Sequence, residues 1–295
     1  MPNFYPWLRS GAKDLPDKRD FSAEHLFGMA PMAIPDSIDL TYDLAALDQQ
    51  ETNHCTAYSL THIHEILNTM EHHQKMRFNP EEQWNNQLEY PGTATEAQGD
   101  YIQSALKSLR KYGLKNNNRT YNIQGYAKIN TDSIKYWLAK KFPIFTGTEV
   151  TRTNYMKAEY EGIYGGRDGE IIGGHAVCIV GYKPGFFIVR TSWGADWGKF
   201  KNGNFLIREA DISLIMTPYI IYDVKDAISS NQMIFKDVSV NSFAASEIKW
   251  CVEKGIFKGY GDENLPPQEK LFMPEKAISR AEMAIVLKRF FDLVK

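Results

Sequence analysis

The hydrophobic pattern of the chain changes at Pro143, and this change limits the folds that the first 224 residues can adopt. Before Pro143, apolar residues recur at helical spacing in residues 53–70, 96–114 and 131–142. After it come four β-rich runs bounded by Gly, Pro and Asn: "PIFTGTEV", "HAVCIVGY", "GFFIVRTSW" and "NFLIREA". Helices that precede strands in one compact unit predict an α+β domain with two lobes.

A second change, in composition, follows Val224. Residues 225–233, "KDAISSNQM", are polar and predict a linker. Residues 234–295 then form a separate short unit with two expected helices, in "SFAASEIKWCVEKGI" and "SRAEMAIVLKRFFDLV". We therefore predict an extended segment over residues 1–38, a main domain over residues 39–224, the linker and a small helical unit.

Charge and composition argue against several classes of protein. The formal net charge of −2 lacks the basic excess that nucleic-acid binding requires. The sequence has no apolar run of membrane-spanning length, so we expect no membrane span, and its first 20 residues lack the apolar core of a secretory signal. The three cysteines are widely spaced, which predicts neither a disulfide framework nor a metal pair. We expect no metal and no cofactor.

Cys55 stands near the start of the first predicted helix, in "LDQQETNHCTAYSL". Taken alone, it is either a small core residue or a nucleophile. A thiol attacks as the thiolate, and the amides of a helix N-terminus lower the pKa of a thiol placed there. Thr52 or Asn53 is a candidate cap for this helix. Gln49, six residues upstream, could donate its side-chain amide to an oxyanion, together with the backbone N–H of Cys55.

His175 is the candidate base for this thiol. It lies in "GGHAVCIVGY", after two glycines and at the start of an apolar strand that can line a cleft. The following run, "GFFIVRTSWGADWG", could bring an orienting group beside the imidazole. A histidine in a strand is also often purely structural. We expect the other two cysteines, Cys178 and Cys251, to be structural residues of the core.

Four segments in the same order resemble the papain-like cysteine peptidases, in particular the bacterial branch. These are "KDLPDKRDF" with "IPDSIDL", "QQETNHCTAYSL", "GGHAVCIVGY" and "VRTSWGADWG", and "EAQGDYIQSAL" is a weaker match to the substrate-binding glycine turn. The resemblance implies a two-lobed papain-like fold, with a helical lobe and a β-barrel-like lobe. It makes Cys55 the nucleophile, His175 the general base and acid, and Gln49 the oxyanion donor.

The resemblance also assigns a shield and a cleft. It implies that Trp193 shields the histidine from water, and that Gly99, Asp100 and Gly174 border the substrate cleft. Two positions depart from the family pattern. Thr191 stands where the family has an orienting Asn, and its hydroxyl has a shorter, β-branched reach. Asn53-His54 replaces the usual Gly-Ser before the cysteine, and could crowd the cleft or add a titrating group near the thiol.

The C-terminal unit resembles an S-layer homology module. The matching residues are Phe235-Lys236-Asp237-Val238, Gly255-Ile256, Gly259-Tyr260, Phe272, Pro274 and Ile278-Ser279-Arg280-Ala281-Glu282. Such modules bind anionic secondary polymers of the bacterial cell wall. The resemblance implies a polymer site at Arg280, Glu282, Phe243, Gly259 and Tyr260, with Phe243 where many relatives have Trp. Alternatively, Arg280 only pairs with a neighbouring carboxylate.

These observations predict a cysteine peptidase that hydrolyses peptide bonds through a Cys–His thioester mechanism, anchored to a cell-wall polysaccharide at the bacterial surface. Its partners would be a peptide or protein substrate and the secondary wall polymer. Because such modules usually occur in threes, one copy also predicts a homotrimer or docking onto another protein. The alternative is a catalytically impaired papain-like shell that acts in binding, adhesion or scaffolding, in a phage or secreted particle among other settings.

Five of the seven histidines lie between residues 54 and 73: His54, His62, His64, His72 and His73. A metal site or a pH sensor is one interpretation of this cluster. Because His62 and His64 point to different faces of a helix, we expect a solvated helix end instead.

Overall fold

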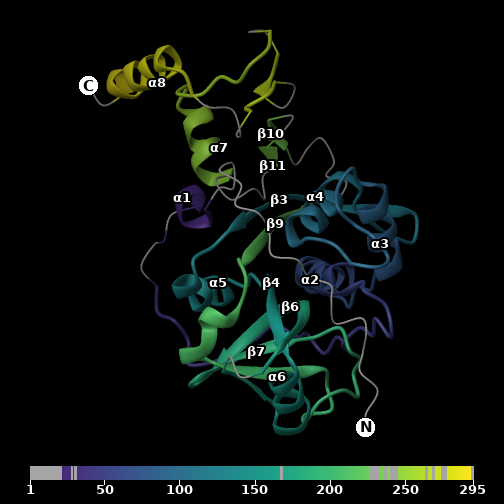
Figure 1. Cartoon of the computed structure of the whole chain (residues 1–295). Helices are drawn as coiled ribbons and strands as arrows, with labels where there is room; N and C mark the ends of the chain where they lie inside the picture. Colours follow the sequence, from purple (N-terminus) through teal and green to yellow (C-terminus); the bar gives the residue numbers. More distant parts are fainter. Residues whose placement is uncertain are drawn as a thin grey trace. The chain divides into compact units, whose positions relative to one another are not determined.

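The computed structural model describes residues 22–27, 29, 32–166, 169–225, 233–235, 238–239, 245–262, 265–267, 270–273 and 278–293. The chain divides into two compact units, Met1–Val224 and Lys225–Lys295 (Figure 1). Residues 1–21 of the predicted N-terminal segment and residues 226–232 of the predicted linker lie outside the described residues.

In the described part of the first unit most helices precede most strands, but this order is less complete than the change at Pro143 predicts, because strands over Leu114–Asn116 and Arg119–Lys128 lie before Pro143. Its helices are α1 (Ala23–Phe27), α2 (Cys55–His72), α3 (Pro80–Glu89), α4 (Ile102–Tyr112), α5 (Ile134–Ala139) and α6 (Arg152–Met156). Short 3-10 turns cover Thr131–Ser133 and Glu209–Leu214, and a π-helical turn covers Lys157–Glu161. The sequence predicted α2, α4 and α5, and Gly113, with φ 69°, ends α4 as expected.

Helix α3 was not predicted, although its start has a clear cap. The side chain of Asn79 accepts a hydrogen bond from the Glu81 N–H at 3.0 Å, and Pro80 occupies the first helical position. The segment lacks a strong apolar stripe, since only Gln83, Trp84 and Gln87 are buried in it. The cap was therefore the better signal here than hydrophobic periodicity.

The strands form one mixed sheet in the order β2-β3-β9-β4-β6-β7-β8-β5, with β1 paired to β6. Their bounds are β1 Ile38–Asp39, β2 Leu114–Asn116, β3 Arg119–Lys128, β4 Ile144–Thr151, β5 Ile163–Tyr164, β6 Ile171–Lys183, β7 Phe186–Arg190, β8 Asn204–Arg208 and β9 Tyr219–Lys225. The long strand β6 is central, because it pairs with β1, β4 and β7. Helices and this mixed sheet together confirm the α+β class.

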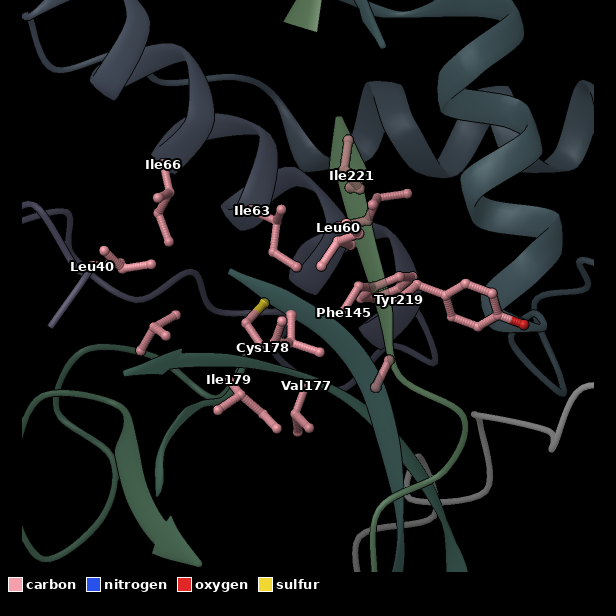
Figure 2. Packing of buried hydrophobic residues seen from close by; sticks show 14 of the residues in the cluster. Leu40, Leu60, Ile63, Ile66, Phe145, Val177, Cys178, Ile179, Tyr219 and Ile221 are labelled. Carbon is pink, nitrogen blue, oxygen red and sulfur yellow. The ribbon is translucent and has the colours of Figure 1, made fainter. Parts of the chain in front are cut away.

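The core of this unit forms where α2 packs against β6. Leu60, Ile63 and Ile66 project from one face of the helix toward Cys178 and its neighbours in the strand (Figure 2). Each fully buried aliphatic side chain of this kind contributes about 1.5–3 kcal/mol to folding. Cys178 is completely buried, and its thiol donates to the Ser59 carbonyl oxygen, with 3.0 Å between the two atoms. The prediction that Cys178 belongs to the core agrees with this position.

The prediction of a solvated histidine cluster was wrong for three of its five members. His54, His62 and His64 are at most 5% exposed, whereas His73 lies at the exposed end of α2. The helix is buried on all sides over residues 55–69, so its second face meets protein instead of water. The arginine Arg190 donates to Nε2 of His62 at 3.1 Å, which assigns the proton of that neutral ring to Nδ1.

The second unit consists of two short strands and two helices within the described residues. Strand β10 (Met233–Phe235) pairs with β11 (Val238–Ser239), and the helices are α7 (Ala245–Glu253) and α8 (Arg280–Leu293). A small cluster forms its core: Phe235, Val238 and Ile248, with Val252 and Phe272 packed against it. No helix among the described residues has the length and apolar character that crossing a membrane demands.

The burial of His64 predicts a loss of stability in acid. Burial lowers the pKa of His64 from 6.5 to about 3. Between these values the unfolded chain binds a proton that the folded chain does not. The free energy of unfolding therefore falls as the pH drops below 6.5, by about 1.4 kcal/mol per pH unit for this group. His64→Phe should remove this share of the slope in denaturant titrations between pH 7 and pH 4.

A matched control for this experiment is His73→Asn, because His73 is exposed and has φ 52°, a conformation that Asn tolerates. That variant should keep the wild-type slope. An His64→Phe slope identical to the wild-type slope would show that His64 takes up its proton in the folded state too.

Candidate active site

Cys55 is the first residue of α2, and its side chain lies against β6. It is fully buried, and its sulfur accepts a hydrogen bond from the Ala176 N–H at 3.4 Å. A second link between helix and strand lies one turn on, where the Ser59 hydroxyl donates to the Ala176 carbonyl oxygen at 2.8 Å. The residue before Ala176 is His175, so the helix start and the histidine strand meet at this point, 120 residues apart in the sequence.

The cap of α2 differs from the prediction. His54 occupies the N-cap position, with φ −91° and ψ 19°, and its side chain makes no capping hydrogen bond. Thr52 and Asn53 lie before it in the turn. The backbone N–H of Cys55 belongs to the first helical turn, whose amides have no acceptor within the helix. It therefore points toward the space in front of the helix, where the sequence interpretation needs an oxyanion donor.

The imidazole of His175 is held by stacking. Its ring centroid lies 4.2 Å from that of Trp193, with 15° between the planes. Trp193 in turn contacts Tyr155 and Trp197 edge-on, at 5.2 and 4.6 Å between centroids. His175 is only 2% exposed. Trp193 thus covers one face of the His175 ring.

Burial also sets the charge of this histidine. Desolvation lowers the pKa of His175 from 6.5 to about 3. The ring is therefore neutral near neutral pH until a negative charge forms beside it. A neutral imidazole can accept a proton, which is the state that a general base must have before it acts.

Gln49 is fixed by two hydrogen bonds that distinguish the ends of its side-chain amide. Its Oε1 accepts from the Ser192 hydroxyl at 2.5 Å, and its Nε2 donates to the Thr52 carbonyl oxygen at 2.6 Å. The backbone also pairs, with the Gln49 N–H donating to the Ser192 carbonyl oxygen at 2.8 Å. Because an amide nitrogen carries two N–H groups, one remains for a substrate oxygen. Sequence reasoning did not identify Ser192 as the residue that sets this orientation.

Thr191 is buried next to this segment but bonds elsewhere. Its hydroxyl donates to the Gly203 carbonyl oxygen at 3.4 Å and accepts from the Trp193 N–H at 3.2 Å. Nε2 of His175 is buried and has no hydrogen-bond partner among the described residues. The hydroxyl therefore does not supply the orienting bond that an Asn carbonyl is expected to make, and the stacking on Trp193 fixes the plane of the ring.

The predicted substrate turn lies near the start of α2. In it, Thr95 and Gly99 exchange backbone hydrogen bonds of 2.9 and 2.8 Å, and Gly99 adopts φ 74°. Asp100 is buried, and its carboxylate accepts from Gln87 and Thr93 at 2.8 Å each. Burial raises the pKa of Asp100. Asp100 thus supports the turn through the hydrogen bonds that its buried carboxylate accepts.

The other predicted cleft residue, Gly174, lies in β6, where it pairs with Glu149 of β4.

The described polymer-site candidates gather at the start of α8. Ser279 and Glu282 form the predicted capping box: each side chain accepts from the other residue's N–H, at 2.7 and 3.1 Å. The Tyr260 hydroxyl donates to Glu282, and Arg280 is exposed in the first turn. Position 259 favours glycine for two reasons: its φ is 73°, and a Cβ there would lie 2.6 Å from the Phe235 ring. Phe243 lies outside the described residues.

Among the described residues, no group of three or more His, Cys, Asp or Glu side chains could hold a metal ion. The arrangement around Cys55 instead fits covalent chemistry by a thiol. It combines a sulfur at a helix start, a neutral buried imidazole on the facing strand and a fixed amide donor.

Comparison with protein families matches two parts of the chain. The family described as Papain family cysteine protease matches residues 79–217, and the S-layer homology domain matches residues 234–284. The first match contains His175 and Thr191 and begins after Cys55. The sequence resemblances to both families are thereby confirmed.

Two relatives cover different shares of the chain. An uncharacterized peptidase C1-like protein of Acanthamoeba polyphaga mimivirus is 26% identical over 303 residues, covering 78% of this chain and 94% of that protein. A cellulosome-anchoring protein of Acetivibrio thermocellus is 32% identical over 120 residues, covering 41% of this chain and 22% of that protein.

Solved structures share the fold of the first unit. Xylellain, a cysteine protease from Xylella fastidiosa, aligns with a TM-score of 0.60 and 22% identity over 76% of this chain and 99% of that chain. A Carica candamarcensis cysteine protease aligns with a TM-score of 0.54 and 18% identity, covering 65% of this chain and all of that chain. These similarities establish the predicted papain-like fold.

The missing partner of His175 Nε2 predicts the effect of Thr191→Asn. A side-chain carbonyl at this position would accept from the imidazolium N–H, which stabilises the charged ring and raises the pKa of His175 above about 3. Histidine titration by NMR in a Cys55→Ala background should show this increase. Thr191→Val, which removes the hydroxyl without adding an acceptor, should leave the titration unchanged. Equal pKa values in the Asn and Val variants would contradict this account of the site.

Proposed function

Since the chain joins a papain-family C1 peptidase domain to a C-terminal S-layer homology domain, we propose that it is a cysteine peptidase held at a bacterial cell surface. The observation that carries the proposal is the contact between Cys55 and the backbone of Ala176, immediately after His175. It brings a helix-start thiol and a shielded, neutral imidazole to one place. Peptide bonds are the expected substrate, and the reaction is their hydrolysis.

In the first step, His175 removes the proton of the Cys55 thiol as the sulfur attacks the substrate carbonyl carbon. The carbonyl π electrons move to oxygen, and the second N–H of Gln49 Nε2 and the backbone N–H of Cys55 donate to that oxyanion. The negative charge formed beside the ring compensates the cost of burying an imidazolium. Trp193 keeps water from this ion pair.

The second step releases the amine and the acid in turn. The C–N bond breaks as His175 returns its proton to the leaving nitrogen, which leaves a thioester on Cys55. Water then attacks the thioester carbon, with His175 accepting one water proton. Breakdown of this intermediate releases the carboxylic acid, and the proton returns to the thiolate.

A second candidate function is a binding shell without efficient catalysis. Two observations favour it: the unpartnered Nε2 of His175, and the complete burial of Cys55. Without an orienting hydrogen bond the ring has a weaker preference for the productive tautomer. In that case the domain would contribute adhesion or scaffolding. The reactivity of the Cys55 thiol toward an inhibitor distinguishes this function from that of a peptidase.

The S-layer homology domain is the proposed anchor. Anionic secondary polymers of the cell wall, often pyruvylated, are the ligands such modules bind. Arg280 is exposed at the start of α8, where a helix N-terminus and a forked cation both favour a carboxylate. Glu282 accepts hydrogen bonds from the Ser279 N–H and the Tyr260 hydroxyl at the same helix start. The name of the cellulosome-anchoring relative agrees with a location at the surface of a cell or of a secreted particle.

We further propose that this unit self-associates as a homotrimer. Helix α8 exposes several large apolar side chains that one module cannot bury: Met283, Ile285, Leu287, Phe290 and Phe291 are each at least 40% exposed. Three copies packed together would cover them and would display three polymer sites, which raises avidity for a repetitive ligand.

Labelling with an epoxide inhibitor of cysteine peptidases tests the peptidase proposal. We expect the wild-type protein to be alkylated at Cys55 and to hydrolyse a peptide substrate, and Cys55→Ala to do neither. Peptide mapping by mass spectrometry assigns the label, because Cys251 is the more exposed cysteine. Cys251→Ser is the matched control and should retain both labelling and turnover. A folded wild-type protein that never labels at Cys55 would favour the binding shell.

Arg280→Gln tests the anchor. The loss of one charged hydrogen bond should weaken binding to cell walls that carry pyruvylated polymer by about tenfold. Lys288→Gln removes the same charge from an exposed position of the same helix and should bind as the wild type does. Equal binding of both variants in a sedimentation assay would rule out Arg280 as the polymer contact.

A further inference from the structure

We propose that His54, as an imidazolium, is a positioning residue that fixes the turn at residues 93–100 against the start of α2. This inference deepens the proposed function and rests on it, because the turn is the expected substrate-binding wall. The neighbouring residue is Cys55, so one short segment would hold both the nucleophile and the wall that positions the peptide.

The geometry around His54 selects its charged form. Nδ1 lies 3.2 Å from Oε1 of Glu81, and Nε2 lies 2.9 Å from Oε2 of Glu96. A neutral imidazole has one N–H and can donate to one carboxylate only. The imidazolium has two and satisfies both. His54 therefore bridges α3 and the turn most strongly when it carries a proton on each nitrogen.

Trp84 supports the pairing of His54 with Glu96 by contacting both residues. Its ring stacks on His54 with centroids 4.1 Å apart and 19° between planes, which favours a cationic ring. Its Nε1–H also donates to Oε1 of Glu96 at 2.7 Å. Hydrogen bonds from Trp84 and then from His54 lower the pKa of Glu96. Since the Glu96 side chain is 67% exposed, its charge is screened, and bond geometry matters more than net attraction.

The turn is tied to the helix start by backbone contacts as well. The side-chain amide of Asn53 donates to the carbonyl oxygens of Glu96 and Ala97, at 3.0 and 3.3 Å. Asn53 and His54 thus both hold Glu96, Asn53 through its main-chain carbonyl and His54 through its carboxylate. These are the two positions where the sequence departs from the family's Gly-Ser. The departure replaces small residues by a clamp.

The charged groups that face His54 are two carboxylates. Glu81 faces it from α3 and Glu96 from the turn, and the Tyr58 hydroxyl of α2 donates to Glu81 at 2.7 Å. One imidazolium between two carboxylates gives a net charge of −1, so the group does not stabilise a thiolate at Cys55. Its effect is on position.

Hydrogen exchange in a Cys55→Ala background tests the clamp without relying on activity. The amides of Gln98 and Gly99, which donate to the Thr95 carbonyl oxygen, should exchange about tenfold faster in His54→Ser. His54→Gln keeps one donor and should show a smaller effect. His73→Asn is the exposed-histidine control.

In the Cys55 enzyme, His54→Ser should raise the KM for a peptide about tenfold and change kcat far less, because it displaces the wall and not the reacting atoms. Unchanged exchange in folded His54→Ser and His54→Gln proteins would overturn the proposal. If His54→Ser does not fold, the exchange of His54→Gln alone decides. Faster exchange in a protein whose wild type is inactive would support the clamp and reject the peptidase function, so the two failures are distinguishable.

Discussion

The contact between α2 and β6 is the interaction on which the rest of the structure depends. It buries Leu60, Ile63 and Ile66 against the centre of the sheet and fixes the point along the strand at which the helix begins (Figure 2). The contacts of Cys55 and Ser59 with Ala176 then follow from the same packing. A thiol and an imidazole that are distant in sequence are thereby held by a hydrophobic core, which is more rigid than a loop.

The site differs from the family pattern in how its histidine is held. Stacking on Trp193 fixes the plane of His175, but both flipped orientations of the ring keep that plane, and its buried Nε2 gains no partner from Thr191. A buried group without a hydrogen bond costs free energy. Both the neutral imidazole and the imidazolium bear this cost, and the cost is larger for the imidazolium. The thiolate must therefore provide more of the stabilisation in this chain than where a carbonyl accepts the N–H.

The sequence was sufficient to predict the α+β class, the helices that begin at Cys55 and Ile102, and the positions of β4, β6, β7 and β8, because periodicity and Gly or Pro boundaries are local signals. It failed for α3, where the buried residues are mostly polar, and for the buried faces of His54, His62 and His64. Burial of a polar residue depends on partners such as Glu96 and Arg190, which are remote in sequence. The roles of Ser192 and Trp84 have no local signal either, since each acts through tertiary contacts, Ser192 with Gln49 and Trp84 with His54 and Glu96.

The substitutions at Asn53 and His54 show why a local departure from a family motif need not damage a site. Taken alone, a histidine at a helix N-cap is unfavourable, since a positive charge opposes the helix dipole. Here Glu81 and Glu96 outweigh that charge, and Trp84 covers the ring, so the same residue joins three segments of the chain. The chain has no disulfide among its three free cysteines, and a bridge of this kind supplies a cross-link between the helix start and the turn.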